Sequence, residues 1–170
     1  MQILLSPQQL NLSILRLAHH VTENHTSLQE FVIIGIQPRG VKFSDKLVEA
    51  IRSIRPSESV QYGMLDITFY RDDVREELHN ANKTHIPFSI EGKTVLLVDD
   101  VLYTGRTIRA ALDALQDFGR PQKVELCVLV DRRFDRELPI QPDFCGKTID
   151  STISQKVKVE WERNEVVLYQ

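Results

Sequence analysis

Cysteine is scarce in this sequence, with two residues in a chain of 170. Cys127 lies inside the apolar run VELCVLV, and Cys145 lies inside PDFCGK. Two cysteines at this separation exclude a disulfide framework and a zinc site built from closely spaced cysteine ligands. We therefore expect two reduced thiols that have no redox role.

Long hydrophobic runs are also missing. No segment reaches the length of about 18 apolar residues that is typical of a membrane-crossing helix. The opening MQILLSPQQL lacks the basic start and the apolar length of a secretory signal. The sequence therefore predicts a cytoplasmic protein that does not enter a membrane.

Strong charge of one sign is absent as well. The formal net charge is −3 and the pI is about 6.0, so the chain lacks the broad basic field that drives non-specific nucleic-acid binding. A local basic patch is compatible with this balance. The length, with 42% hydrophobic and 26% charged residues, is that of one globular domain spanning residues 1–170.

Apolar patterns along the chain alternate between helix and strand. Helical spacing predicts a helix over 8–24, capped by Ser6 with Pro7 at its first position. Further helices are expected at 41–54 and 107–119, and strands at 31–36, within 61–71, at 93–100 and at 123–131. This order predicts an α/β fold with a mostly parallel, doubly wound sheet flanked by helices.

The C-terminal third has a different composition. Residues 132–149 are rich in Pro and Arg, and we expect them to form a small cap, or hood. Residues 156–170, KVKVEWERNEVVLYQ, alternate like two antiparallel strands around the turn ERNE. We expect this segment to form an edge hairpin.

An acidic pair, Asp99 and Asp100, ends the strand-like run KTVLLVDD. In open parallel sheets ligands bind beyond the carboxyl ends of the strands, so this position indicates a site. Adjacent carboxylates suit the vicinal hydroxyls of a sugar. For an isolated Asp-Asp pair, simple capping of the following turn is an equally good explanation.

A hydroxyl- and glycine-bearing loop follows the acidic pair. Thr104 and Thr107 supply hydroxyls, Gly105 can adopt a positive φ, and the N-terminus of the next helix favours an anion, so the loop indicates a phosphate site. It is not an ATP-type phosphate loop, because Arg106 stands where that motif requires lysine.

The complete stretch VLLVDDVLYTGRT, residues 95–107, resembles the phosphoribosyl pyrophosphate (PRPP) signature of type I phosphoribosyltransferases. The resemblance implies the fold of that family. It also implies that the acidic pair binds the ribose 2′- and 3′-hydroxyls and that the Thr-Gly loop binds the 5′-phosphate. The PRPP-binding residues would then be Asp99, Asp100, Val101, Leu102, Tyr103, Thr104, Gly105, Arg106 and Thr107.

Two more segments fit the same resemblance. GIQPRG looks like the pyrophosphate loop, with Pro38, Arg39 and Gly40, and we expect a cis Gln37–Pro38 bond because the trans preference before proline is only about 0.5–1 kcal/mol. Residues 71–91 stand where the family has a mobile lid, in which Arg71 would face the departing diphosphate; a solvated surface loop is the alternative. Mg²⁺ would arrive with PRPP near the acidic pair, without a firmly assigned protein ligand.

The segments DITFYRDDV, GRP and RELPIQPDFCGKTI, together with the PRPP stretch, look like the bifunctional PyrR family. That resemblance implies conversion of uracil and PRPP to UMP and diphosphate, UMP-responsive binding to pyrimidine-operon leader mRNA, and a homodimer or larger homo-oligomer. A purine-salvage (hypoxanthine or guanine) phosphoribosyltransferase is the alternative, although Tyr103 replaces the aspartate usual in purine enzymes. The cap would place Phe144, Cys145 and Arg132 at the base, unless Phe144 anchors the core.

The RNA-binding surface of the family is only partly matched. Matching basic positions are Arg16, His19, Arg136 and Lys147, whereas departures fall at Leu15, Pro38, Arg133, Phe134 and Gln141. The family reads Asp-Arg-Gly-His-Arg-Glu-Leu-Pro where this chain reads DRRFDRELP, with one residue more and neither the Gly nor the His. A phosphoribosyltransferase without RNA binding therefore stays open as an alternative.

Overall fold

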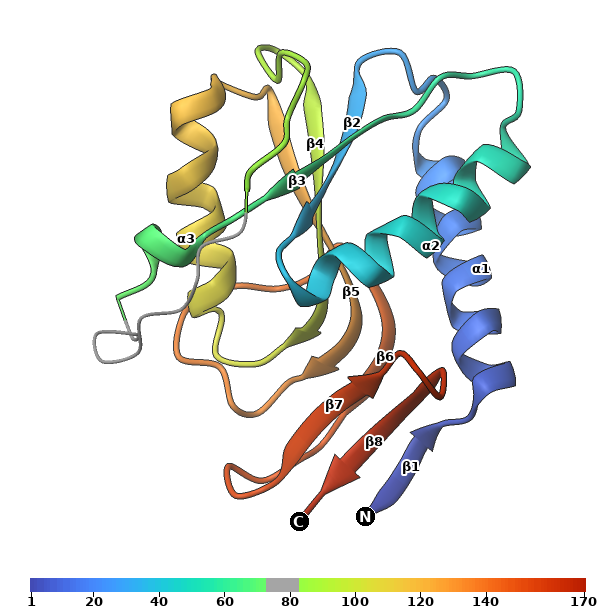
Figure 1. Cartoon of the computed structure of the whole chain (residues 1–170), viewed down its shortest axis with the longest axis vertical. Coiled ribbons are helices and arrows are strands. Elements are labelled where there is room, and N and C mark those ends of the chain that lie inside the picture. The colour runs from blue at the N-terminus through green and yellow to red at the C-terminus, as the bar shows by residue number, and fades with distance from the viewer. Residues whose placement is uncertain (73–82) are drawn as a thin grey trace.

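The computed structural model describes residues 1–72 and 83–170, and it shows an α/β fold with two sheets (Figure 1). The larger sheet is parallel, in the order β3 (Gln61–Leu65), β2 (Phe31–Ile36), β4 (Thr94–Leu102), β5 (Lys123–Arg132) and β6 (Phe144–Ile149). The smaller sheet is antiparallel, in the order β1 (Gln2–Leu5), β8 (Glu165–Tyr169) and β7 (Lys156–Glu160). The predicted fold class is confirmed.

Helices cover both faces of the parallel sheet. α1 (Pro7–Asn24) and α2 (Arg39–Ile54) lie on one side, and α3 (Arg106–Leu115) lies on the other (Figure 1). Two short 3₁₀ turns, η1 (Thr68–Tyr70) and η2 (Gln116–Phe118), complete the described elements. No helix in the described part of the chain is long and apolar enough to cross a bilayer.

The central strands carry continuous apolar runs because both faces of the sheet are covered. In β2, Ile33 packs in the core beneath α1 and α2, and Ile34 packs in the core beneath α3. In β4, Leu96 and Leu97 divide in the same way. This two-sided burial explains why the sequence shows continuous apolar runs there instead of alternation.

The first helix begins where the sequence predicts. The Ser6 Oγ accepts a hydrogen bond from the Gln9 backbone N–H at 3.4 Å, and the Gln9 side chain accepts one from the Ser6 N–H at 2.9 Å, which forms a complete capping box ahead of Pro7.

The prediction of a separate cap over residues 132–149 is wrong for its second half. Residues Phe144–Ile149 are β6, which pairs in parallel with β5 as the fifth strand of the main sheet. The run FCGKTI is short, follows a Pro-rich segment and contains glycine, lysine and threonine, so it lacks the apolar continuity of the other strands. Gly146 allows the close approach, because a Cβ there would lie 2.6 Å from the Leu129 carbonyl oxygen.

The small antiparallel sheet (β1, β8 and β7) covers the carboxyl ends of the main sheet instead. It lies at the bottom of Figure 1 and is called the roof below. The predicted hairpin is present as β7 and β8, but it pairs with the N-terminal strand β1, which the sequence analysis missed, and not with the edge of the main sheet. The carboxyl ends of β4 and β5 point toward this roof, and the two termini lie near each other in it (Figure 1).

The segment predicted as a lid is described only in part. Residues 73–82 lie outside the described residues. Residues 83–91 follow the outer edge of β3, where His85 and Met64 exchange backbone hydrogen bonds of 2.8 and 2.9 Å, and Ile90 is buried in the core. This described stretch is packed on the body of the protein, and the lid stays a prediction.

Candidate active site

A cleft of about 690 Å³ opens at the carboxyl ends of β2 and β4, on the side that faces the small antiparallel sheet. Its walls come from the end of β2 and the start of α2, the stretch around η1, the acidic pair of β4, the start of α3, the end of β5 and the segment that leads into β7. The lining residues are Ile36, Gln37, Pro38, Arg39, Ile67, Thr68, Arg71, Asp99, Asp100, Val101, Tyr103, Thr107, Arg132, Ile153, Ser154, Gln155, Lys156 and Val157.

The acidic pair lies at the floor of this cleft. Asp99 and Asp100 are 7% and 5% exposed. Burial, and then repulsion from Asp100, raises the pKa of Asp99 well above its usual range. Burial raises the pKa of Asp100 as well, although the nearby Arg39 charge opposes the rise. Two buried like charges side by side are costly without a ligand, which is typical of a binding site and untypical of a simple turn cap.

The phosphate loop has the geometry that its sequence predicts. Gly105 has φ 93° and precedes the first residue of α3, so the helix N-terminus opens toward a second hollow of about 380 Å³ next to Asp99. The Thr104 Oγ1 accepts a hydrogen bond from the Arg106 N–H at 3.4 Å. Thr107 lines both the hollow and the cleft.

The segment predicted as the pyrophosphate loop lies against the acidic pair. The Gln37–Pro38 bond is cis, as expected. Gly40 packs directly on β4, because a Cβ there would lie 2.6 Å from the Val98 carbonyl oxygen and 3.2 Å from the Asp99 Oδ1. This contact fixes the start of α2 beside the carboxylates, so that Arg39 lines the cleft next to them.

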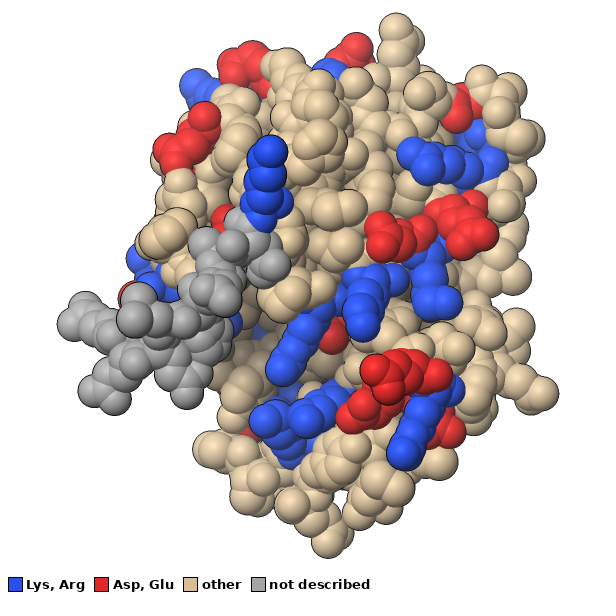
Figure 2. Space-filling model, in the orientation of Figure 1, with Lys and Arg blue, Asp and Glu red and all other residues tan. Residues whose placement is uncertain are grey.

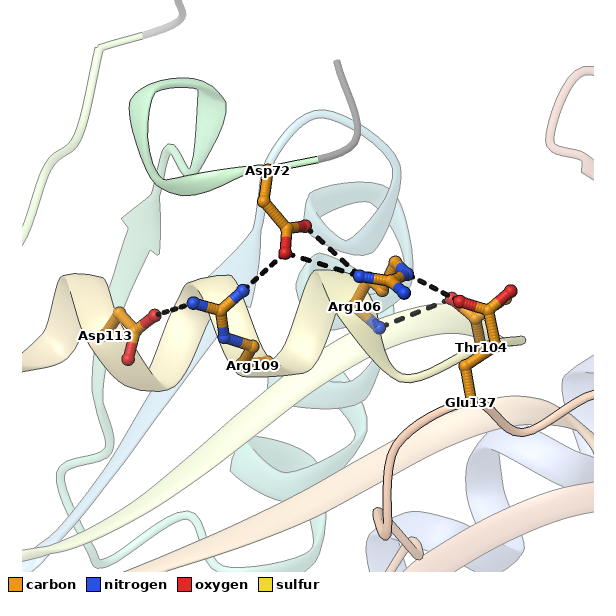
Figure 3. A network of polar contacts seen from close by, with 6 residues as sticks. All are labelled: Asp72, Thr104, Arg106, Arg109, Asp113 and Glu137. Atoms are coloured by element: carbon orange, nitrogen blue, oxygen red, sulfur yellow. Dashed lines mark hydrogen bonds and ion pairs between the residues drawn. The ribbon is translucent and has the colours of Figure 1, made fainter. Parts of the chain in front are cut away.

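Two arginines of the predicted site behave differently. Arg71 lines both the cleft and the phosphate-loop hollow, and its charge lowers the pKa of Asp99, against the larger effects of burial and Asp100. The Arg106 side chain instead pairs with Asp72 and with Glu137, at 3.3 and 2.5 Å (Figure 3). The Arg106 guanidinium is thus engaged in ion pairs within the protein, and the Arg106 backbone N–H faces the loop.

The residues expected to contact the nucleobase are only partly brought together in the cleft. Arg132 lines the cleft, and its guanidinium lies 3.9 Å above the Tyr103 ring. Cys145 and Phe144 are not among the lining residues. Phe144 is buried in the core against α1, with its ring centroid 4.9 Å from that of His20, and this burial supports the alternative of a core anchor.

The sequence analysis missed the segment that does close the cleft. Residues 153–157 line one wall, and Arg132 orders the stretch before them by bonding the Ser151 Oγ at 2.8 Å and the Thr152 carbonyl at 3.0 Å. The only signal in the sequence was a short polar stretch, DSTISQ, between two β-patterned runs.

The basic residues proposed for RNA make contacts within the protein. Arg16 donates to the Gly146 carbonyl, and Lys147 donates to the Leu4 carbonyl at 2.8 Å, so both connect the N-terminal segment with β6. Arg136 pairs with Asp131 and donates to the Tyr103 carbonyl, and His19 is exposed. On the face drawn in Figure 2, Lys and Arg side chains, with Asp and Glu side chains among them, lie between the start of α2 and the β7–β8 hairpin.

The described residues contain no group of three or more His, Cys, Asp or Glu side chains placed to hold a metal ion. The acidic pair nevertheless offers hard oxygen ligands of the kind that Mg²⁺ accepts in small number when substrate phosphates supply the rest. The donor set therefore fits a metal that arrives with a phosphorylated substrate.

Comparison with known proteins agrees with this geometry. The model of the phosphoribosyl transferase domain family matches residues 3–164. The chain is 43% identical over 166 residues to a bifunctional protein PyrR of Chloroflexus aurantiacus, covering 96% of this chain and 90% of that one. It is 48% identical over 157 residues to a bifunctional protein PyrR of Desulfosudis oleivorans, covering 91% and 86%.

Solved structures with the same fold are more distant in sequence. A hypoxanthine phosphoribosyltransferase of Trypanosoma cruzi superposes with a TM-score of 0.78 at 19% identity, covering 100% of this chain and 91% of the other. A hypoxanthine phosphoribosyltransferase of Staphylococcus aureus superposes with a TM-score of 0.68 at 22% identity, covering 88% and 77%. These likenesses concern the fold.

Proposed function

The chain belongs to the phosphoribosyltransferase family and, within it, to the PyrR family, and on that premise we propose that it transfers a phosphoribosyl group from Mg·PRPP to uracil. The products are UMP and diphosphate. The observation that carries the proposal is the buried carboxylate pair between a phosphate-type loop and the arginine-bearing start of α2.

The three parts of the cleft match the three parts of PRPP. The Gly105 turn and the N-terminus of α3 would hold the 5′-phosphate through backbone N–H groups and the Thr104 and Thr107 hydroxyls. Asp99 and Asp100 would accept hydrogen bonds from the ribose hydroxyls, which offsets the cost of burying both carboxylates.

The third part is the diphosphate, which would lie at the start of α2. In the reaction the C1′–O bond would break with its electron pair going to diphosphate, and uracil N1 would bond to C1′ as its proton passes to solvent. Arg39 and Arg71, which both line the cleft, would stabilise the charge that develops on the leaving group. Mg²⁺ would supply further positive charge to the diphosphate when PRPP brings it. The segment at 153–157 would exclude water from the reacting carbon.

Uracil is preferred over a purine because Tyr103 is engaged by Arg132 where purine enzymes usually carry an aspartate. The test incubates the protein with Mg·PRPP and uracil, hypoxanthine or guanine in separate reactions, and follows diphosphate release and nucleotide formation. Consumption of uracil alone supports the proposal. Consumption of a purine with uracil untouched refutes it in favour of purine salvage.

We further propose a second role as a UMP-responsive, RNA-binding regulator of pyrimidine genes. The support is the name of the relatives, which are called bifunctional. The test is a gel-shift titration of pyrimidine-operon leader RNA with and without UMP. If UMP does not tighten binding, the protein is a phosphoribosyltransferase without this function.

A homodimer or larger assembly is part of the same proposal. Light scattering during size-exclusion chromatography tests it, and a mass near the 19.6 kDa of one chain would contradict it.

A further inference from the structure

A network of ion pairs lies outside the cleft, on the exposed side of α3 (Figure 3). It joins Asp72, Arg106, Arg109, Asp113 and Glu137. Asp72 is its centre, because one carboxylate oxygen lies 2.7 Å from Arg109 and 3.3 Å from Arg106. None of the proposed substrate contacts explains why three segments distant in sequence place complementary charges here.

The network fastens two segments to the start of α3. One is the stretch from η1 to Asp72, residues 68–72. The other is the stretch around Glu137, which is also held by backbone hydrogen bonds from the Glu137 and Leu138 N–H groups to the Thr104 carbonyl, at 2.9 and 3.1 Å. The phosphate loop is thus held by a network of which Arg106 and Glu137 line the neighbouring hollow and Asp72, Arg109 and Asp113 do not.

Arg71 lies between two such fastenings. On one side, the Tyr70 hydroxyl donates to Asp117 in η2. On the other side, Asp72 pairs with Arg106 and Arg109 in α3. The backbone at Arg71 is therefore tied down immediately before and immediately after a side chain that lines the cleft beside Asp99.

We propose that Asp72 is a positioning residue for PRPP: its ion pairs with Arg106 and Arg109 hold Arg71 at the cleft, where it meets the diphosphate. This inference rests on the proposed phosphoribosyltransferase function. Its physical basis is conformational entropy, because a backbone that is already fixed loses less freedom when the ligand binds.

The sign of the effect separates this mechanism from simple electrostatics. Asp72 carries a negative charge near a site for a polyanion, so neutralising it through Asp72→Asn would tighten PRPP binding if only through-space charge mattered. Positioning predicts the opposite, a weakening. The paired side chains are 41% to 45% exposed, and exposed pairs contribute up to about 1 kcal/mol, so we expect a loss of about two- to fivefold.

The experiment measures binding of Mg·PRPP by calorimetry in the absence of any base, so that the identity of the acceptor does not matter. We expect Asp72→Asn and Arg109→Gln each to weaken Mg·PRPP binding about two- to fivefold. The double variant is expected to bind Mg·PRPP no more weakly than the weaker-binding of the two single variants, because both substitutions remove the same ion pair. Asp72→Glu is expected to restore binding. The ratio between variant and wild type is expected to approach one at about 1 M salt, where the Debye length is about 3 Å.

The matched control is Asp113→Asn. It removes a partner of Arg109, at 3.4 Å, and a negative charge from the same helix, but leaves the link to Asp72. Its PRPP affinity is expected to stay within about 1.5-fold of wild type. Thermal unfolding of every variant checks that the fold is intact, and Asp72→Ser carries the test if Asp72→Asn does not fold, because it also removes the carboxylate and so keeps the sign of the comparison.

Unchanged or tighter binding by Asp72→Asn, or additive losses in the double variant, overturns the inference while leaving the proposed function standing. Failure of the wild-type chain to bind Mg·PRPP refutes the proposed function, and the inference with it.

Discussion

Replacing Asp99 with asparagine is expected to make the ligand-free protein more stable while it weakens PRPP binding. The side chain is 7% exposed, and its pKa is raised by burial and by the neighbouring Asp100. Asparagine has nearly the same shape, and its Oδ1 can still accept the Asp100 backbone N–H, now at 2.9 Å from the carboxylate. The substitution therefore removes charge and leaves the packing in place.

The magnitude follows from linkage. Each unit by which a folded-state pKa is raised costs about 1.4 kcal/mol once the pH exceeds the raised value. Leaving a buried polar group poorly compensated costs about 1–3 kcal/mol, and we expect Asp99→Asn to recover that amount at pH 7. For a chain of this length each kcal/mol corresponds to an increase of about 2–4 °C in the unfolding midpoint.

The pH dependence has a definite sign. Because the folded state holds the Asp99 proton more tightly than the unfolded state, stability falls as the pH rises from the ordinary Asp range, about 3.9, through the raised folded-state pKa. The variant is expected to lose only part of this slope of stability against pH, since Asp100 still contributes.

The effect on PRPP binding has a separate cause. Asp99→Asn removes a charge-assisted hydrogen bond to the ligand, worth about 1.5–3 kcal/mol, which predicts PRPP binding weaker by about ten- to a hundredfold.

The assay is urea unfolding of the ligand-free protein from pH 4 to pH 9, with calorimetric titration of Mg·PRPP at neutral pH. Asp113→Asn is the control, because it removes an exposed carboxylate from α3 and is expected to change neither quantity. A variant of Asp99 that is no more stable than wild type at pH 8, and that keeps the full pH slope, would refute the account of a strained acidic pair.

Three further predictions concern other parts of the molecule. Phe144→Ala is expected to lower the free energy of unfolding by about 3–5 kcal/mol, because it empties a core site beneath α1; chemical denaturation measures this, and unchanged choice of base in the folded fraction would separate core packing from base recognition. Gly105→Ala places a side chain at φ 93°, which costs about 1–2 kcal/mol, so PRPP binding is expected to weaken with little change in uracil's apparent affinity at saturating PRPP. Glu125→Gln is expected to destabilise the protein at pH 7 and to reduce its acid sensitivity near pH 4: burial raises the Glu125 pKa, but Lys123 and His25 outweigh it and lower the value, so this contribution is present at neutral pH and is lost as the pH falls. A pH series of thermal unfolding that matches wild type would contradict the last expectation.

The central fold was predictable because its signals are local. The runs FVIIGI and KVELCVLV are apolar on both faces and short, so a buried parallel strand is the natural interpretation, and the Ser6–Pro7 start of α1 is a complete capping signal. The PRPP stretch was predictable for the same reason: acidic pair, glycine turn and helix start are consecutive in the chain, and the strand and helix on either side hold them in place.

The roof was not predictable in the same way because its pairing is distant. β1 is only four residues long, and three of them are exposed or half-buried, so nothing in Gln2–Leu5 indicates a partner near residue 168. The position of Phe144 illustrates the same limit. An aromatic side chain after a Pro-rich stretch fits a cap or a core equally well, and only the parallel pairing with β5 decides between them.

The wall at residues 153–157 was missed for a third reason. Apart from Val157, which is buried, its residues are polar or, like Ile153, exposed, and they carry no motif. Their placement depends on Arg132, whose buried guanidinium bonds the preceding loop from another strand. Such a contact between side chain and backbone across 20 residues has no periodic signature.

The pairing of β1 with β8 sets the order in which a newly made chain acquires its site. Every strand of the parallel sheet, with both carboxylates and the phosphate loop, is present once residue 149 has been synthesised, but the roof needs Gln2 to meet Leu168. Contacts between residues so far apart in sequence form slowly, because the loop-closure entropy must be overcome first. We therefore expect the roof to close over the cleft late in folding, after the strands that carry the acidic pair have been made.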